Sequence, residues 1–446
     1  MRIAALITVL SLALVTCKNI DNADPSPRTS FVKFFEQEYS TTAASLEVIP
    51  EGYVILGNAQ VSDTDDQGNE VSFSQTVVVQ TDKNGNRVGE PFETTGGTGN
   101  SIKALITNGT VSGYVIVGDS IYLDPLAEQA ANVTVSSLRV LFLDANLKSV
   151  GKFILTDTSP IAPNKVREDF SGVSVEITSD GRVIILGTLK KGVVNQQSAP
   201  AEPFILALKK NFTLDWTRSY DLLGRTSQNS KSLHYANGKI IWASAIAQVQ
   251  GAFTSSWVSI PVVDENSIFP NYSVIGQNSD QLFIPKDIQT AYSPGLGFGV
   301  VGTYSLETDG AKGNMFFLRV DATGSIIPGS DRYFDAITLA VTDRTQSLII
   351  DEGEAITSTR DDGFVIAGTT TTNPEKGNGG KDIFLVKVNS FGDLVWIKTI
   401  GGAGDEVPSA ICETAEGDIV ICGTNTLGDY ASVFLMKTDK NGELKN

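Results

Sequence analysis

Short apolar runs separated by glycine-containing turns recur along most of this chain. The clearest copy surrounds Thr357–Gly402 and reads as four strands, Ala355–Arg360, Phe364–Thr369, Ile383–Val388 and Leu394–Ile400. Asp362-Gly363 separates the first two runs. Asp-Gly between β-rich runs is a strong hairpin signal because Gly adopts a positive φ without a steric clash. The stretch therefore predicts a four-stranded antiparallel unit.

The second strand of this unit recurs as an apolar run that follows a glycine and in most copies ends in one. The copies begin at Gly52, Gly113, Gly181, Gly238, Gly297, Gly363 and Gly417, between 54 and 68 residues apart. The third strands are Thr76–Gln80, Leu138–Leu143, Phe204–Leu208, Trp257–Val263, Met315–Val320, Ile383–Val388 and Val433–Lys437. Most of them lead into an Asp-x-x-Gly turn, in which Asp caps the backbone and Gly takes the φ that other residues resist. Regular recurrence of one unit predicts a single repeat array rather than three separate domains.

The two ends of the array are incomplete in complementary ways. Phe31–Tyr39 aligns with a fourth strand but has no first three before it, and nothing after Val433–Lys437 supplies a fourth strand. One sheet is completed if the array closes into a ring, which also protects the sheet edges. We therefore predict an all-β fold over residues 29–446: a seven-bladed β-propeller of four-stranded antiparallel blades, closed by an N-terminal strand that completes the last blade.

The repeat motif resembles that of a known group of proteins. Asp362–Gly368, Asp382–Gly392 and Trp396–Gly402 carry the pattern best. The pattern, Asp-Gly-[Gly/Phe]-Tyr/Val-Ile-x-Gly in its second strand, is similar to the β-propeller repeats of secreted and lipid-anchored bacterial proteins of Bacteroidetes-like lineages. The resemblance covers about residues 29–446 and implies the propeller fold. It implies little about function, because one scaffold hosts many activities.

The N-terminus has the pattern of an export signal. Met1-Arg2 precedes the largely apolar run Ile3–Val15, which is too short to cross a bilayer as a helix. Leu14–Cys17 resembles the lipobox of bacterial lipoproteins, with Thr16 where Gly, Ala or Ser is usual. The resemblance implies a signal peptide over residues 1–16, lipid on Cys17, a flexible tether over residues 17–28 and a location at the bacterial cell envelope, in the outer membrane. The alternative is an ordinary signal peptide with an incidental cysteine.

The charge of the chain excludes some partners. It has 34 Lys and Arg against 51 Asp and Glu, a formal net charge of −17. Phosphate backbones and anionic lipids repel such a body. We therefore expect no nucleic-acid partner, and membrane contact only through the lipid anchor.

Few residues carry recognisable chemistry. The one histidine, His234, lies in an apparent strand and cannot by itself supply a multi-histidine metal site. The acidic stretch Asp63-Thr-Asp65-Asp66-Gln-Gly68 resembles the opening of a calcium loop, but its twelfth position is Ser74, where a bidentate Glu is expected. A looser Ca²⁺ site and a solvated acidic loop both remain open.

Cys412 and Cys422 flank the turn at Glu416-Gly417. Two interpretations are open: a disulfide across a hairpin in an oxidising envelope, or two small buried apolar residues.

Loop lengths indicate where recognition takes place. The links between second and third strands are long, as are several links between units, and alternating strand direction puts both classes on one face of the ring. This long-loop face would carry Asp63, Asp65 and Asp66 together with Asp119 and Asp124, all candidates for ligand or calcium binding. Binding residues are usually placed on such loops.

No catalytic constellation stands out in the sequence. We therefore expect a cell-envelope lipoprotein whose propeller is a binding or scaffolding module for a glycan or an envelope protein, with no cofactor other than Ca²⁺. The alternative is a polysaccharide hydrolase that uses loop carboxylates. Two carboxylates within roughly 5–10 Å in one pocket, beside aromatic side chains that stack on sugars, would favour the hydrolase.

Overall fold

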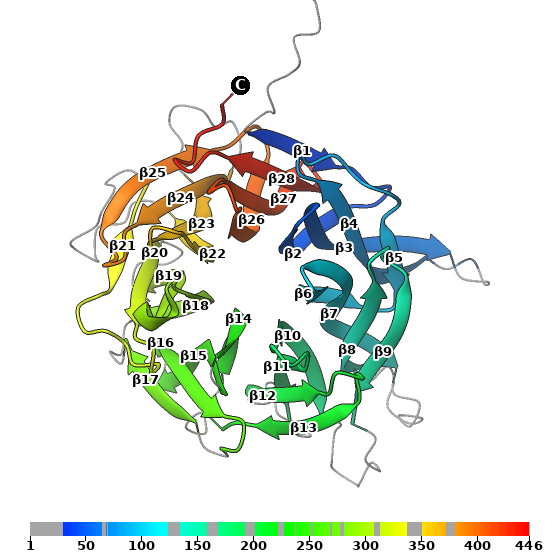
Figure 1. Cartoon of the computed structure of the whole chain (residues 1–446), viewed down its shortest axis with the longest axis horizontal. Coiled ribbons are helices and arrows are strands. Elements are labelled where there is room, and N and C mark those ends of the chain that lie inside the picture. The colour runs from blue at the N-terminus through cyan, green and yellow to red at the C-terminus, as the bar shows by residue number, and fades with distance from the viewer. Residues whose placement is uncertain are drawn as a thin grey trace, which may run out of the picture.

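The computed structural model describes residues 30–64, 68, 70–123, 134–157, 168–191, 201–221, 227–236, 238–250, 253–267, 270–276, 281–306, 313–336, 350–371 and 380–445. Over these residues the chain forms β-strands and one short 3-10 turn, η1 (Pro294–Leu296), and no α-helix. The sheets are arranged radially around a central axis, so the fold is a β-propeller (Figure 1). None of the described segments is a helix long and apolar enough to cross a bilayer.

Five sheets have four antiparallel strands each. Four of them follow the sequence from the axis outward: β2 (Thr41–Ile49), β3 (Gly52–Thr64), β4 (Glu70–Asp82), β5 (Phe92–Thr95); β6 (Thr98–Thr107), β7 (Thr110–Leu123), β8 (Thr134–Asp144), β9 (Ser149–Leu155); β10 (Asp169–Ile177), β11 (Val183–Lys190), β12 (Ala201–Leu208), β13 (Leu214–Ser219); and β22 (Asp351–Ser358), β23 (Phe364–Thr370), β24 (Asp382–Val388), β25 (Leu394–Ile400). The fifth contains β26 (Asp405–Glu413), β27 (Ile419–Leu427), β28 (Tyr430–Thr438) and β1 (Phe31–Phe35).

The sixth sheet has eight strands in two antiparallel halves. One half is β14 (Ser227–Ala236), β15 (Lys239–Gln250), β16 (Phe253–Asp264) and β17 (Asn271–Ile275), and the other is β18 (Gln281–Thr290), β19 (Phe298–Leu306), β20 (Asn314–Val320) and β21 (Arg332–Phe334). The pairing between the halves is the single parallel bridge of Ser256 with Leu282. The innermost strands of the ring, here called the inner strands, are β2, β6, β10, β14, β18, β22 and β26 (Figure 1).

The predicted closure of the ring is confirmed. β1 pairs antiparallel with β28, from Phe31 opposite Lys437 to Phe35 opposite Val433. The strand ends at Phe35 rather than at Tyr39. The Phe31 ring reaches the neighbouring sheet, where a Cβ on Gly85 would approach it to 2.4 Å. The N-terminal strand therefore contacts both the last sheet and the first.

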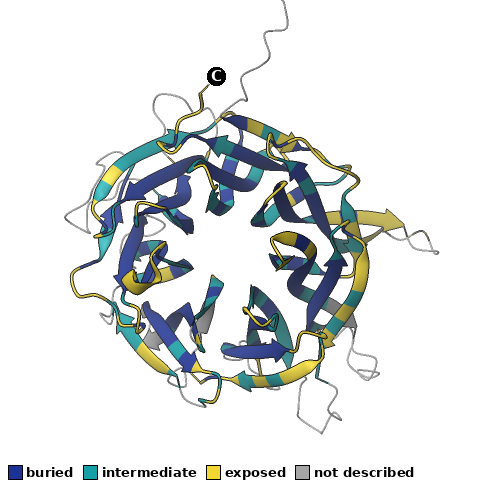
Figure 2. Cartoon of the chain, viewed as in Figure 1, coloured by how far each residue is buried: buried dark blue, intermediate teal, exposed yellow. Residues whose placement is uncertain are grey.

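Burial explains why the second and third strands are so readable in the sequence. Every residue of β24 is buried, whereas the outer strand β25 has no fully buried residue. Strands covered by neighbouring sheets on both faces read as continuous apolar runs. Around the ring the middle strands of the sheets are the most buried, and exposed residues gather at the outer rim (Figure 2).

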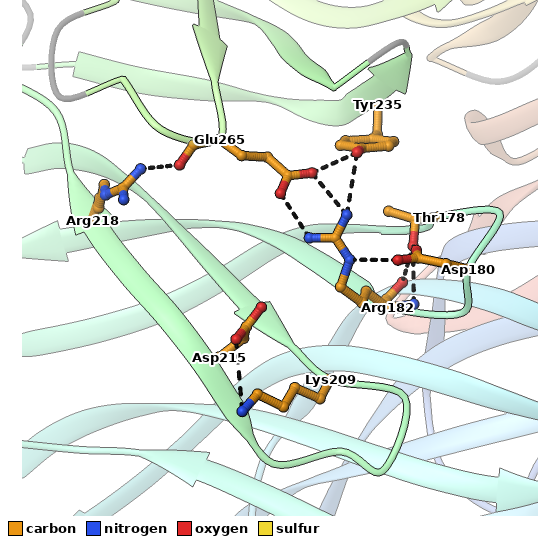
Figure 3. Close-up of polar contacts among 8 residues, drawn as sticks. All are labelled: Thr178, Asp180, Arg182, Lys209, Asp215, Arg218, Tyr235 and Glu265. Carbon is orange, nitrogen blue, oxygen red and sulfur yellow. Dashed lines mark hydrogen bonds and ion pairs between the residues drawn. The ribbon is translucent and has the colours of Figure 1, made fainter.

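Polar contacts join the turns of neighbouring sheets on the face opposite the long loops. The Arg182 guanidinium, next to the β10–β11 turn, forms two bonds of 2.7 and 2.9 Å with the Glu265 carboxylate, which follows β16 (Figure 3). The Tyr235 hydroxyl donates to the same carboxylate at 2.5 Å, and Asp180 pairs with Arg182 at 3.0 Å. The hydrogen bonds from Arg182 hold the pKa of Glu265 below its usual value. This cluster fills the junction between β10–β13 and β14–β17.

One predicted loop is largely strand. The first of the long links expected between second and third strands, Asn58–Ser72, is mostly paired, since β3 and β4 continue as a hairpin to Thr64 opposite Glu70. Val61 and Phe73 stand opposite each other in this extension. β-Branched and aromatic residues at paired positions stabilise a β-ladder. This explains why β3 and β4 extend beyond the residues of the repeat motif.

Candidate ligand-binding site on the ring axis

The inner strands share an irregularity that shapes the centre of the ring. Each pairs with its second strand through a register shift: Ala43/Ser45, Gly99/Ser101, Gly172/Ser174, Asn229/Leu233, Pro285/Asp287, Gly353/Ala355 and Pro408/Ala410. A β-bulge adds a residue, bends the strand and re-aims its side chains. Repeated around the ring, it turns short segments of every inner strand toward the axis.

These segments line an axial cavity of about 180 Å³. The lining repeats a three-residue pattern, Ser45-Leu46-Glu47, Ser101-Ile102-Lys103, Ser174-Val175-Glu176 and Ser232-Leu233-His234, and adds Asp287, Gln289, Thr357 and Cys412 among others. Of the described residues that line the cavity, none is Phe, Tyr or Trp. The cavity therefore combines charged and hydroxyl groups with aliphatic side chains, and its described lining offers no aromatic surface on which a sugar ring could stack.

Lys103 connects two carboxylates from neighbouring inner strands. Its ammonium lies 3.5 Å from the Glu47 carboxylate and 4.0 Å from that of Glu176. Burial raises the pKa of Glu47 and of Glu176, and Lys103 partly offsets both shifts. The negative charge of Glu47, in turn, raises the pKa of Lys103. The Lys103 ammonium can donate a hydrogen bond to a ligand oxygen, and the Glu47 and Glu176 carboxylates can accept hydrogen bonds from ligand hydroxyl groups.

His234 continues this row of polar side chains on β14. Its Nε2 lies 2.7 Å from the Ile288 carbonyl oxygen, so Nε2 carries the proton and donates. Burial lowers the pKa of His234 to about 4. The imidazole is therefore neutral at pH 7. Among the described residues no group of three or more His, Cys, Asp or Glu side chains is arranged to hold a metal ion.

A second charged group lies beside the bulges of β18 and β22. The Glu354 carboxylate pairs with Lys231 at 3.0 Å and with Lys286 at 3.1 Å. Burial alone would raise the pKa of Glu354, but the two ammonium groups outweigh it and lower the pKa. Three inner strands are thereby connected by charge near the axis.

Asp287 has a structural role in this region. Its carboxylate accepts from the backbone amides of Ile356 at 3.0 Å and Ile288 at 2.9 Å, and from the Ser232 hydroxyl. Burial raises its pKa despite these bonds. The carboxylate therefore fastens β14, β18 and β22 together.

The acidic residues singled out in the sequence do not come together as a site within the described part of the chain. Asp63 lies exposed on β3 opposite Val71, and its carboxylate caps the amide of Thr64 at 2.7 Å. Asp65, Asp66 and Asp124 lie outside the described residues.

Asp119 is a strand residue of β7 rather than a loop residue. Its carboxylate accepts from the Gly172 amide at 2.8 Å, the Ser171 hydroxyl at 2.9 Å and the Asn100 amide at 3.3 Å. Burial raises its pKa despite these bonds. Asp119 therefore joins β7 to β10, a role that no local sequence pattern indicates.

The two C-terminal cysteines are free thiols. Cys422 stands opposite Ala410 and Cys412 opposite Val420, so they are offset in the register and do not face each other. The structure agrees with a small buried residue for Cys422, whereas Cys412 is half-buried and lines the axial cavity. Burial raises the pKa of both thiols to about 12, so neither is a thiolate at neutral pH.

Sequence reasoning missed the axial residues because Glu47, Lys103 and Glu176 lie on separate strands far apart in the chain. A signal was nevertheless present. In three consecutive units the first strand reads Ser, an aliphatic residue, then a charged residue. Aligning the first strands as well as the second and third would have brought these charges together, because equivalent positions in a ring of repeats face one axis.

No protein-family model and no curated protein sequence matches the chain. Solved structures with a similar arrangement include the polysaccharide lyase Uly1, with a TM-score of 0.49, 9% identity and coverage of 91% of both chains. Another is the Penicillium chrysogenum alpha-L-arabinanase complexed with arabinobiose, with a TM-score of 0.42 and 10% identity, covering 92% of this chain and 98% of that one. A glucose dehydrogenase has a TM-score of 0.37 and 9% identity, covering 92% and 99%. With TM-scores below 0.5, none of these similarities carries an argument about function.

Proposed function

We propose that this protein is a bacterial envelope lipoprotein whose propeller binds a hydroxyl-rich ligand, either a glycan or a polar segment of an envelope protein. The observation that carries the proposal is the axial cavity with Lys103 between Glu47 and Glu176. Paired donors and acceptors of this kind match hydroxyl groups, which both donate and accept. A volume of about 180 Å³ suits one sugar ring or one polar side chain rather than an extended polymer.

The ring in this proposal has seven blades. We infer that the halves β14–β17 and β18–β21 are separate blades, because one parallel bridge is a much weaker connection than a ladder. Each half has its own inner strand, and each inner strand lines the cavity. Seven blades also agree with the seven copies of the repeat, which resembles that of bacterial lipid-anchored propellers, and we propose that Cys17 carries the lipid. Residues 1–29 lie outside the described residues.

The long-loop face would extend the binding surface beyond the cavity. Asp63 on the β3–β4 hairpin would add a carboxylate there, and so would Asp65, Asp66 and Asp124, which lie outside the described residues, with Ca²⁺ bridging to a ligand as one option. Carboxylates at such a surface disfavour polyanions.

A glycan array and an envelope pull-down with the detergent-solubilised full chain test the proposal. Lys103→Met should weaken binding at least tenfold, since a lost charge-assisted hydrogen bond is worth about 1.5–3 kcal/mol. Lys440→Met, on an exposed turn lysine away from the axis, is the matched control and should bind normally. Equal binding by both variants would remove the cavity from recognition. Binding that fails only when Asp63, Asp65 and Asp66 are changed to Asn would assign it to the loops instead.

The hydrolase is the second candidate, because Glu47 and Glu176 share one cavity. Their carboxylate oxygens can be no farther apart than the sum of the two distances to Lys103, which is compatible with the roughly 5–9.5 Å of glycosidase carboxylate pairs. Two observations argue against it: none of the described residues that line the cavity is aromatic, and Lys103 lies between the two acids. Turnover of an envelope polysaccharide that Glu47→Gln abolishes while binding persists would favour the hydrolase over the binding module.

A further inference from the structure

A second cavity, of about 200 Å³, lies on the face opposite the long loops, among the tight turns that join first to second and third to fourth strands. It opens between the β14–β15 turn and the turns of the β18–β21 strands. Its walls are largely apolar and include Ile241, Val262, Pro294 and Phe298. Ile241 and Phe298 belong to the apolar core packed between the two halves of the eight-stranded sheet. The cavity therefore continues directly from that core.

Comparison with another junction of the ring explains why space is left here. Two residues before the turn that follows β8 stands Phe142, which stacks on Phe212 of the next sheet at 3.8 Å between ring centroids. The corresponding residue before the turn after β16 is Val262, and the residue that corresponds to Phe212 is Gly324 in the Asp321–Gly324 turn. Val262 and Gly324 thus stand where the other junction has the stacked rings of Phe142 and Phe212.

Other junctions are filled by polar groups. In the following unit, the residue that corresponds to Val262 is Arg319. Its guanidinium donates to the carbonyl oxygens of Ser390 and Leu296. The junction before the cavity is filled by the ion pair of Arg182 with Glu265 (Figure 3). The junction between β14–β17 and β18–β21 has neither an aromatic stack nor an arginine at this place.

The lining also supplies one positive charge. Lys239 is exposed and lines the cavity. It stands opposite Asp264 in the β15–β16 register, yet none of the ion pairs among the described residues includes its ammonium. The Asp321 carboxylate nearby is occupied by the amides of Thr323 at 2.8 Å and Ser325 at 2.9 Å. An ammonium beside an apolar hollow suits a ligand with an apolar body and an anionic end.

We propose that this junction is a binding site for a small aromatic carboxylic acid. The aromatic ring lies in the hollow and packs on Val262 and Phe298, and the carboxylate pairs with Lys239. The size agrees, since an apolar cavity of about 150 Å³ is enough to hold benzene. The ring gains burial from the apolar walls, and the carboxylate keeps partial contact with water at the mouth. This site is independent of the axial cavity and of the function proposed for it.

Benzoate is the probe, and the neutral benzyl alcohol is its comparison. Ligand-observed NMR and calorimetry with the full chain should give saturable binding of benzoate, several-fold tighter than that of benzyl alcohol and weaker at high salt. Lys239→Gln should bring benzoate down to the level of benzyl alcohol. Lys440→Gln, on an exposed turn lysine elsewhere, should not change binding. Absence of saturable benzoate binding, or equal affinity of the two probes for the unaltered chain, overturns the assignment.

Filling the cavity supplies the second test. Val262→Phe places a side chain where the ligand ring would lie and should reduce benzoate binding at least tenfold. Ala322→Trp obstructs the cavity from an exposed position, where a change does not threaten folding, and should have the same effect. Undiminished binding by folded Ala322→Trp protein would place the benzoate elsewhere and refute the site. A short peptide that ends in a C-terminal Phe distinguishes the two sources of an aromatic carboxylate, since the small free acid proposed here predicts weaker binding by the peptide.

Discussion

Ring closure by β1 leads to a prediction with an internal control. The burial pattern along β1 alternates: Phe31 and Phe35 are each 9% exposed, whereas Phe34 is 50% exposed. The two buried rings pack in a core cluster with Leu46 and Val433, from the first sheet and the last. We predict that Phe35→Ala destabilises the ring and that Phe34→Ala, one residue away in the same strand, hardly does.

The expected size follows from burial. Replacing a buried Phe by Ala costs about 3–5 kcal/mol, whereas exposed substitutions usually change stability by less than about 0.5 kcal/mol. An unfolding entropy of roughly 2.1 cal/mol/K per residue amounts to roughly 0.9 kcal/mol/K for about 420 residues. Phe35→Ala should therefore lower Tm by about 3–6 °C, and Phe34→Ala by less than about 1 °C.

Differential scanning calorimetry of the two variants and of a Thr29–Ser40 deletion is the assay. The deletion should lower Tm further than Phe35→Ala, because it also removes the β1–β28 ladder and leaves β28 as an open edge prone to association. Equal Tm values for Phe34→Ala and Phe35→Ala, or unchanged melting of the deletion, would refute closure by β1.

Four further predictions concern charge and attachment. Cys17→Ala should abolish labelling with a radioactive fatty acid, and persistent labelling would mean another attachment site. Lys103→Met should cost roughly 1–3 kcal/mol at pH 7, less than a fully buried pair because Lys103 is 37% exposed, and urea unfolding should show partial recovery at pH 5 as its carboxylate partners take up protons. Burial lowers the pKa of His234 from 6.5 to about 4, so the unfolded chain takes up the proton first as the pH falls. The free energy of unfolding should therefore be highest above pH 6.5 and fall by roughly 3 kcal/mol as the pH drops to 4. His234→Gln should remove most of this loss in a pH series of Tm. Burial raises the pKa of Asp351 from 3.8 to about 7, so its contribution to the free energy of unfolding is fully present below pH 3.8 and is lost as the pH rises through 7. Asp351→Asn should therefore raise Tm at pH 8 and leave it unchanged near pH 4.

The repeat was legible because its signals are local. Asp-Gly turns and continuous apolar third strands such as Ile383–Val388 follow from backbone sterics and from burial on both faces, and both leave marks within a few residues. The pairing of β1 with β28 was also predictable, since a missing strand at one end and an unmatched one at the other leave few arrangements.

The sites were not predictable in the same way. Asp119 looked like a loop carboxylate, but its role depends on the Gly172 amide of another sheet, and no local rule connects the two. The cavity beside Val262 is formed with residues of other strands and turns that are distant in the chain, among them Phe298 and Gly324.

The sequence by itself therefore determined the repeating unit, the tight turns and the closing strand, because hydrogen-bond ladders and turn sterics act between near neighbours in the chain. The tertiary structure alone decided which side chains meet. The inner-strand bulges turn Glu47, Lys103 and Glu176 toward one axis, and their charges interact only because ring closure brings three distant strands within a few ångströms. Side-chain proximity between distant segments depends on the register and curvature of whole sheets, and a linear pattern of residues does not encode these quantities locally.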